Sequence, residues 1–291
     1  MAEPSAEIGI IGGSGFYSLI DGAQEVTLST PYGEPSDPIV LADIADRKVA
    51  FIPRHGRDHR HPPHRINYRA NLWALRSLGV RQILAPCAVG SLRPELGPGM
   101  VVVPDQLVDR TSGRAQTYFD VSAVHVPFAD PYCQIGRDVV LRGAAEAGED
   151  CVDGGTMVVI EGPRFSTRAE SQWYAAQGWA LINMTGYPEA ALARELAMCY
   201  VPIALVTDLD AGLGIGSGVR QDEVFQIFDA NLPRLRALVL STVARLPAER
   251  TCECTRALDG IDLPIEIPGY GAQSSSAPSK APSNGTDPSS S

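Results

Sequence analysis

Two aspartates that lie one residue apart, Asp208 and Asp210, follow the apolar run from Tyr200 to Val206. The run is rich in aliphatic and β-branched residues, which is typical of a buried strand. Open α/β sheets bind their ligands at the carboxyl ends of such strands. A carboxyl group beside an apolar wall there has a raised pKa and can donate a proton. The residues alone also allow a simpler interpretation, in which the pair caps the turn after the strand.

A segment from Arg54 to Arg65 concentrates positive charge, since it holds four of the five histidines and four arginines. Its interleaved arginines would repel a metal cation, and it offers one carboxylate and no thiolate. Guanidinium groups and imidazoles suit a phosphate group instead. In a chain of formal net charge −10, we interpret this segment as an anion site rather than as a solvated surface.

A glycine-rich stretch from Gly12 to Gly15 directly follows a predicted strand. Backbone N–H groups in such a turn can approach a phosphate closely. The stretch does not match the dinucleotide-binding fingerprint, because the third glycine would fall on Ser18. No Gly-Lys-Ser/Thr follows it, which excludes a nucleoside-triphosphate loop. A plain tight turn is the alternative.

Polar residues also follow another predicted strand and a further apolar run. The segment 161–170 runs from a strand into a helix, and Thr167 with Glu170 forms a capping-box pattern at the helix start. This pattern leaves Ser166 free to face a ligand. The polar stretch 183–186 ends another apolar run and supplies a second wall for the same pocket.

The elements that must position these residues alternate along the chain. Strands are predicted at residues 8–11, 49–53, 82–85, 100–103, 157–160 and 200–206. Helices are predicted at residues 68–78, 169–177, 188–196 and 222–246, the last with an apolar stripe that would cover one face of a sheet. This alternation, without a linker, predicts a single α/β domain.

Composition sets the limits of the domain and of its partners. The 291-residue chain is 44% hydrophobic and 20% charged, as expected for a globular protein with a sizeable core. We expect one domain over residues 1–271 and a disordered Ser/Pro-rich tail over residues 272–291, which has too little apolar surface to order. The net charge of −10 argues against a nucleic-acid partner. No apolar run is long enough to span a membrane, and the acidic start is not typical of a signal peptide, so we expect a cytoplasmic protein.

The six cysteines divide into two groups. Cys87, Cys133, Cys151 and Cys199 are scattered through predicted folded sequence, and we interpret them as small core residues. The Cys252-Glu253-Cys254 motif has the spacing of a strained disulfide or of half a metal site. No second Cys/His pair follows it in the sequence, so redox or metal chemistry is the less favoured interpretation.

Taken together and in order, these motifs resemble those of the S-methyl-5′-thioadenosine phosphorylases, within the trimeric class of the purine nucleoside phosphorylase family. The match covers nearly the whole folded length and rests on six ordered motifs. They are Gly-Ile-Ile-Gly-Gly-Ser-Gly, Arg-His-Gly-Arg-Asp-His, Gly90-Ser91-Leu92, Glu-Gly-Pro-Arg-Phe-Ser, Asn-Met-Thr and Thr207-Asp208-Leu209-Asp210.

The resemblance implies a twisted, partly closed central sheet surrounded by helices, and it implies phosphorolysis. Inorganic phosphate would attack the anomeric carbon of a 5′-modified adenine nucleoside and release adenine and the sugar 1-phosphate. Phosphate is then a co-substrate, and no metal or organic cofactor is expected. The family also implies a homotrimer, in which His125 reaches the neighbouring subunit's sugar pocket.

Matched motif by motif, the resemblance assigns a role to each remaining candidate. Asp208 is the expected proton donor to N7 of the base, and the reaction suits it because negative charge develops on the leaving purine. The nearby Asp210 helps to keep one of the two carboxyls protonated. The phosphate ligands would be Ser14, Arg54, His55, Cys87, Ala88 and Thr185; the nucleoside would contact Ser166, Met184, Asp208, Asp210, His125 and Gln221.

Four positions bear on substrate specificity or on phosphate binding. Relatives that act on 6-oxopurines typically carry Asn in place of Asp208 and Glu in place of Ser166, so this chain has the aminopurine combination. Gln221 stands where methylthio-selective relatives carry an apolar residue and hydroxyl-selective ones a His, which leaves the preferred 5′ group open. Cys87 stands where Thr is common, which weakens one phosphate donor but keeps the backbone N–H.

Other functions remain as alternatives. A purine nucleoside phosphorylase that acts mainly on adenosine or on 6-oxopurine nucleosides is the main one. A non-catalytic nucleoside-binding module is less favoured, because a mere binder would not need a phosphate site. A nicotinamide-dependent oxidoreductase is disfavoured by the broken glycine fingerprint.

Overall fold

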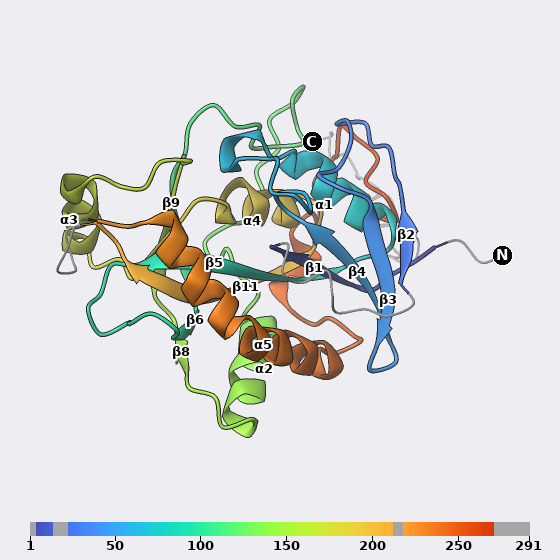
Figure 1. The fold of residues 1–291 in the computed structure, drawn as a ribbon. Coiled ribbons are helices and arrows are strands. Elements are labelled where there is room, and N and C mark those ends of the chain that lie inside the picture. Colours follow the sequence, from blue (N-terminus) through green and yellow to red (C-terminus); the bar gives the residue numbers. More distant parts are fainter. Residues whose placement is uncertain (1–3, 14–22, 212–217, 271–291) are drawn as a thin grey trace, which may run out of the picture.

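Two long parallel strands, β5 (Gln82–Ser91) and β11 (Cys199–Leu209), form the middle of the computed structural model, which describes residues 4–13, 23–211 and 218–270 (Figure 1). They pair along nearly their whole length, with Cys199 opposite Gln82 and Leu209 opposite Ser91. Most residues of both strands are buried, as the unbroken apolar run in the sequence predicts. The predicted tail, residues 272–291, lies outside the described residues.

The other strands extend this pair into one mixed sheet. Strand β1 pairs with the start of β5 and continues through β4 and β3 to β2, whereas β10 pairs with the end of β5 and leads to β9 and β7. Strand β11 also pairs with β6, and β6 pairs with β8. The bounds are β1 (Ile8–Gly12), β2 (Gln24–Val26), β3 (Ile39–Ile44), β4 (Arg47–Pro53), β6 (Val101–Val103), β7 (Gln106–Arg110), β8 (Cys151–Asp153), β9 (Thr156–Ile160) and β10 (Leu181–Asn183).

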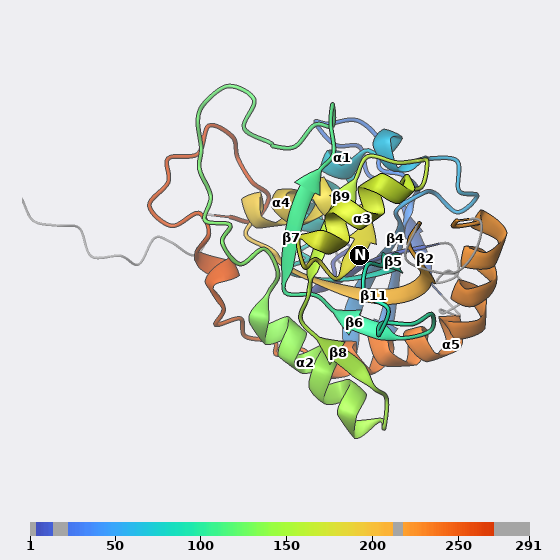
Figure 2. The same ribbon diagram turned by 90° about the vertical axis from the view of Figure 1, so that its left-hand side faces the viewer.

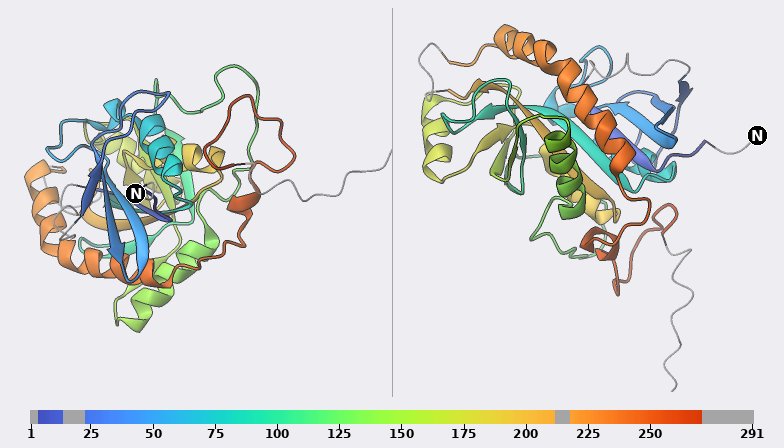
Figure 3. Two further views of the ribbon diagram at one scale, coloured as in Figure 1. Left: turned by 90° about the vertical axis from the view of Figure 1, so that its right-hand side faces the viewer. Right: turned by 90° about the horizontal axis from the view of Figure 1, so that it is seen from below.

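Helices cover both faces of the sheet, and each pair of helices closes one hydrophobic core (Figures 1 and 3). On one face, α2 (Gln134–Glu146) and α5 (Gln221–Arg245) pack side by side against β11. On the other face, α1 (Tyr68–Ser77) packs against α4 (Gly186–Glu195). The predicted α/β fold, with a central sheet surrounded by helices, is confirmed.

Helix α3 (Arg168–Ala176) lies at one end of the sheet, near β9 (Figure 2). Its Tyr174 joins a small third core with residues of the neighbouring strands. The predicted capping box is present: the Thr167 hydroxyl accepts the Glu170 N–H, and the Glu170 carboxylate accepts the Thr167 N–H. This cap fixes where α3 begins, and therefore where the residue before it, Ser166, lies.

Several elements differ from the prediction, and β7 and β8 are among the strands that it lacks. Strand β5 continues past Pro86, although a proline has no backbone N–H to donate to a strand partner. This is possible because the pairing of β5 with β1 already ends at Leu84, whereas β11 pairs with the opposite edge of β5 as far as Ser91. Helix α2 is not predicted, since Gly136 and Gly143 lower its helix propensity. The β2–β3 hairpin is not predicted either. Within the described ranges, none of the helices has both the length and the apolar character needed to cross a membrane.

Candidate active site

A cleft of about 710 Å³ lies at the carboxyl ends of β4, β5, β10 and β11 and beneath the start of α5. This volume is in the range of small-molecule sites. Of the twelve residues singled out from the sequence, the cleft brings ten together: Arg54, His55, Cys87, Ala88, Ser166, Met184, Thr185, Asp208, Asp210 and Gln221. The eleventh, Ser14, lies outside the described residues, beside Gly13, which lines the cleft.

A β-bulge aims Asp208 at the cleft. The register of β11 against β5 shifts between Val206 and Asp208, so Thr207 is the extra residue that turns the end of the strand. Asp208 then lies opposite Gly90. An added Cβ at Gly90 would be 2.8 Å from Ile182 Cγ2 and 3.0 Å from Asp208 Oδ1, so only glycine leaves room for the carboxyl group here.

The two aspartates form an acidic end of the cleft in which a proton is easily held. Burial raises the pKa of Asp208 to about 6. The hydrogen bond that Thr207 donates to its Oδ2 lowers the pKa, and the nearby Asp210 raises it. Burial also raises the pKa of Asp210, although the hydrogen bond that Ser171 donates to its Oδ2 opposes this. Part of the Asp208 population is therefore protonated near neutral pH, which is the state of a proton donor.

Ser166 lies beside this pair, as the capping box requires. It is near enough to lower the pKa of Asp210 slightly, yet its buried hydroxyl makes no hydrogen bond of standard geometry within the described part of the chain. A buried hydroxyl without a partner costs free energy unless a ligand or water satisfies it. Ser166 is thus available to a bound molecule in the cleft.

A buried ion pair forms the opposite, cationic end of the cleft. Arg54 donates from Nε and Nη2 to both oxygens of Glu189, at 2.7 and 2.8 Å, and from Nη2 to the Ile11 carbonyl at 3.1 Å. Tyr200 donates a further hydrogen bond to Glu189 at 2.7 Å. Burial alone would lower the pKa of Arg54, but the Glu189 carboxylate raises it above its usual value. The guanidinium therefore stays charged and rigidly placed.

His55 lies next to Arg54 as a neutral imidazole. Burial, together with the charge of the adjacent Arg54, lowers its pKa to about 4, although the hydrogen bond to the His61 carbonyl opposes this. Its Nδ1 is 2.8 Å from the His61 carbonyl, and since a carbonyl can only accept, Nδ1 carries the proton. Its Nε2 is then an acceptor, able to receive a hydrogen bond from a hydroxyl of a ligand.

The rest of the cationic segment does not face the cleft as a block. Arg57 donates to Asp37 from its backbone N–H and its Nε, and Arg60 lies 3.3 Å from the same buried carboxylate. Neither arginine lines the cleft, whereas His59 and His61 do. Asp37 therefore engages two of the four arginines of the segment, and the predicted phosphate ligands Arg54 and His55 are the ones that line the cleft.

Three further candidates line the floor between the two ends. Asn183 accepts the backbone N–H groups of Thr185 and Gly186 at 2.8 and 2.7 Å, and this fixes Thr185 at the start of α4. A Cβ added to Gly162 would lie only 2.6 Å from the Met184 sulfur, so the position of Met184 requires a glycine there. The positive φ of 65° at Gly162 also favours glycine. Burial raises the pKa of Cys87 to about 12, so it is a neutral thiol.

An apolar wall of the cleft was not predicted from the sequence. Gln221, Val224, Phe225 and Phe228 have the spacing of one helical face, and this face of α5 lines the cleft, with Phe228 also packing against the core. The buried residues of α5 lie in its second half, from Leu235 onward. Gln221 was already a predicted site residue, and its helical spacing from Val224, Phe225 and Phe228 could have indicated that these apolar residues also line the cleft.

His125 is the candidate that the fold does not bring to the cleft. It is exposed, in the segment between β7 and α2, and does not line the cleft of its own chain. The expected place of His125 in a neighbouring subunit's pocket remains a prediction for an assembly.

Comparisons with known proteins agree with one another. A model of the phosphorylase superfamily matches residues 7–244. A purine nucleoside phosphorylase of Streptomyces coelicolor is 59% identical over 274 residues, covering 90% of this chain and 98% of that protein. An S-methyl-5′-thioadenosine phosphorylase of Mycolicibacterium smegmatis is 59% identical over 262 residues, covering 90% and 99%. The structure of a methylthioadenosine phosphorylase from Schistosoma mansoni in complex with adenine has a TM-score of 0.80 and 38% identity, covering 84% of this chain and 93% of that one.

Proposed function

The chain belongs to the phosphorylase superfamily, and we propose that it cleaves the N-glycosidic bond of S-methyl-5′-thioadenosine with inorganic phosphate. The products would be adenine and 5-methylthioribose 1-phosphate. Adenosine is proposed as a second substrate. The relatives named above support this activity, and ten of the proposed site residues line one cleft.

One observation carries the proposal: a fixed cation, at the end of β4, and a carboxyl of raised pKa, at the end of β11, line a single cleft. Phosphorolysis needs both, because positive charge develops on the sugar and negative charge on the leaving purine. Phosphate held by Arg54 would stabilise the first, and protonation by Asp208 would neutralise the second. A binding module would need only the acidic end.

The acidic end suits adenine in particular. On its N7 edge, adenine presents an acceptor at N7 and a donor at the 6-amino group, whereas a 6-oxopurine presents two acceptors. A protonated carboxyl offers one donor and one acceptor. Asp208 would donate to N7 while Asp208, Asp210 or Ser166 accepts from the 6-amino group. This complementarity favours an aminopurine.

At the cationic end we propose that Arg54, His55, Thr185 and the Cys87–Ala88 segment hold the phosphate, with Ser14. The Nε and Nη2 groups of Arg54 already bind Glu189 and Ile11, so Nη1 would meet a phosphate oxygen. The neutral His55 would accept from a phosphate hydroxyl, which favours a protonated phosphate. Cys87, as a neutral thiol, would contribute mainly its backbone.

Between the two ends, Met184 would lie under the ribose, and the 5′ group would reach the wall formed by α5. Val224, Phe225 and Phe228 make that wall apolar, which suits a methylthio group, while Gln221 adds one hydrogen-bonding amide. A substrate hydroxyl would find a partner in that amide. We therefore propose that the enzyme uses both methylthioadenosine and adenosine.

We also propose a homotrimeric, cytoplasmic enzyme that needs no cofactor for the reaction. The exposed segment that carries His125 supports a subunit contact, because Val121 in it is 81% exposed. All six cysteines are free, which is the usual state in the reducing cytoplasm. Analytical ultracentrifugation should give a trimer, and a fully active monomer would remove His125 from the site.

Steady-state kinetics with methylthioadenosine, adenosine and inosine, with and without phosphate, tests the proposal. We expect adenine release that requires phosphate and a sugar 1-phosphate in equal amount. Equal adenine release in phosphate-free buffer would make the enzyme a hydrolase.

The second candidate is a purine nucleoside phosphorylase, favoured by the name of the Streptomyces coelicolor relative. In that case inosine would have the highest kcat/KM of the three nucleosides. The acidic end of the cleft argues for adenine, as above.

A further inference from the structure

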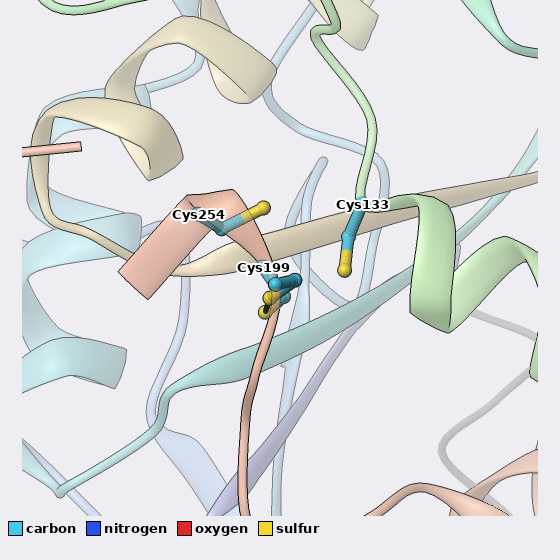
Figure 4. Close-up of side chains that lie close together, drawn as sticks. Cys133, Cys199 and Cys254 are labelled. Atoms are coloured by element: carbon cyan, nitrogen blue, oxygen red, sulfur yellow. Dashed lines mark hydrogen bonds between the residues drawn. The ribbon is translucent and has the colours of Figure 1, made fainter. Parts of the chain in front are cut away.

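Four cysteines converge at the opposite end of β11 from the cleft. Cys133 precedes α2, Cys199 begins β11, and Cys252 and Cys254 flank the start of a short helix, η3 (Glu253–Arg256), in the carboxyl-terminal segment. Their sulfur atoms all lie within 4.8 Å of one another. Figure 4 shows Cys133, Cys199 and Cys254 approaching each other from three different elements. In the part of the chain that the structure describes, this is the one such gathering of potential metal ligands.

We propose that these four thiolates bind a structural zinc ion. Zn²⁺ in such sites is tetrahedral, with Zn–S bonds of about 2.3 Å, which sets the sulfur–sulfur separation at roughly 3.8 Å. The observed separations are compatible with this value, because Cys199 and Cys252 are 3.3 Å apart and no pair of sulfur atoms exceeds 4.8 Å. Small side-chain rotations would therefore complete the tetrahedron. Each thiol would release its proton to solvent on binding.

The fold, not the sequence, assembles the second pair of ligands. The Cys133 N–H donates to the Tyr200 carbonyl at 3.0 Å, which holds the start of α2 against the start of β11. The Cys199 N–H donates to the Arg81 carbonyl at 2.9 Å. The Cys252–Cys254 motif is thus half a site after all, and two cysteines interpreted as core residues supply the other half.

Two guanidinium groups border the cluster, and their positive charge favours a negatively charged site over a neutral one. Arg194 Nη2 is 3.8 Å from the Cys254 sulfur, and Arg250 Nη1 is 3.9 Å from the Cys199 sulfur. Backbone carbonyls hold both arginines in place: those of Pro127 and Asp130 bind Arg194, and that of Ala197 binds Arg250. Zinc with four thiolates carries two negative charges, which such donors stabilise. Disulfides are neutral and gain little from them.

The ion would act on stability rather than on catalysis. Cys199 and Asp208 are at opposite ends of β11, about 30 Å apart at the rise of an extended strand. The cluster joins the carboxyl-terminal segment to β11 and α2, and residues of that segment, such as Leu258 and Ile267, are buried in the core. Metal binding would thereby hold this segment in place.

Metal analysis of the full-length protein, purified without chelator, tests the proposal. We expect one zinc per chain in the wild type and in Cys151→Ser, a cysteine outside the cluster, and less than a tenth of that in Cys252→Ser and Cys133→Ser. Removing the metal should lower the Tm while the kcat of the folded enzyme stays unchanged. A metal-free wild type whose mass is reduced by two hydrogens per disulfide would overturn the proposal, as would iron at full stoichiometry.

A second measurement does not depend on the variants folding. Wild-type protein unfolded with a chelator under reducing conditions and refolded with Co²⁺ should show the intense visible bands of tetrahedral cobalt bound to thiolates. Cobalt bands identical to those of Co²⁺ in buffer would contradict the site, even if every serine variant were insoluble.

Discussion

Each end of the cleft contains a buried acidic group, but one of these groups is paired with a cation and the other is not. Glu189 lies against Arg54, which donates to both of its oxygens, and the two form a buried salt bridge. Asp208 instead lies near a second carboxyl, that of Asp210, and burial raises its pKa to about 6. Both ends are buried, so burial alone does not decide the charge; the neighbouring group does.

This difference separates binding from proton transfer. The cationic end keeps its charge across the working pH range, as the anchor for a phosphate must. The acidic end changes its protonation within that range, as a general acid must. Variants that remove one partner at a time should therefore have different signatures at the two ends.

The largest effect is expected at the acidic end. Asp208→Asn keeps the shape of the side chain but has no titratable proton to donate to N7. Turnover of methylthioadenosine and adenosine should fall about 10²–10⁴-fold, with the phosphate KM nearly unchanged and a smaller loss, or a gain, on inosine. Asp229→Asn is the matched control, because it changes an aspartate in the same cleft outside the pair. Unchanged adenosine turnover in Asp208→Asn would exclude it as the donor.

At the cationic end the main effect should be on stability and phosphate binding. Arg54→Ala leaves Glu189 buried without its cation, which costs about 3–5 kcal/mol of unfolding free energy. Losing one charge-assisted bond should weaken phosphate binding by about 1.5–3 kcal/mol. Urea unfolding and the phosphate KM measure the two effects.

The double variant Arg54→Met/Glu189→Gln separates these two effects. It removes both charges, so much of the stability should return while the phosphate KM stays high. If the double variant restored the phosphate KM as well, Arg54 would serve only the fold.

The contrast between the two ends was only partly predictable from the sequence. Motifs that are contiguous in the chain indicated the residues of the cleft, because a strand end followed by a turn fixes their position locally. The partner of Arg54 was not indicated, since Glu189 is 135 residues away and meets it only through the packing of α4 against the sheet. The same holds for the pairing of Cys133 and Cys199 with the Cys252–Cys254 motif. The apolar wall of α5 was assigned to the core because a helical stripe does not reveal what it faces.

The pH dependence should reveal the acidic end alone. Since the pKa of Asp208 is raised to about 6 in the folded protein, its protonated form is favoured by folding, and its contribution to stability is lost as the pH rises from about 4 through 6. By the same titration, kcat/KM should fall up to about tenfold per pH unit above 6. Phosphate titrates in a similar range, so the comparison with Asp208→Asn is needed. If the fall of kcat/KM above pH 6 persists unchanged in Asp208→Asn, it belongs to the titration of phosphate or of another group.

The smallest effect concerns the region between the two ends, where neither charge acts directly. An apolar pocket gains roughly 0.8 kcal/mol per buried methylene-sized group, and leaving a substrate hydroxyl unpaired costs about 1–3 kcal/mol. The Gln221 amide can satisfy that hydroxyl but must itself be desolvated when a methylthio group binds. Gln221→Val should therefore move the kcat/KM ratio towards methylthioadenosine by about tenfold, or some 1.4 kcal/mol. The phosphate KM and the fall of kcat/KM above pH 6 should stay unchanged in this variant, which distinguishes the wall from both ends of the cleft. A ratio that stays fixed would mean that another residue sets the 5′ preference.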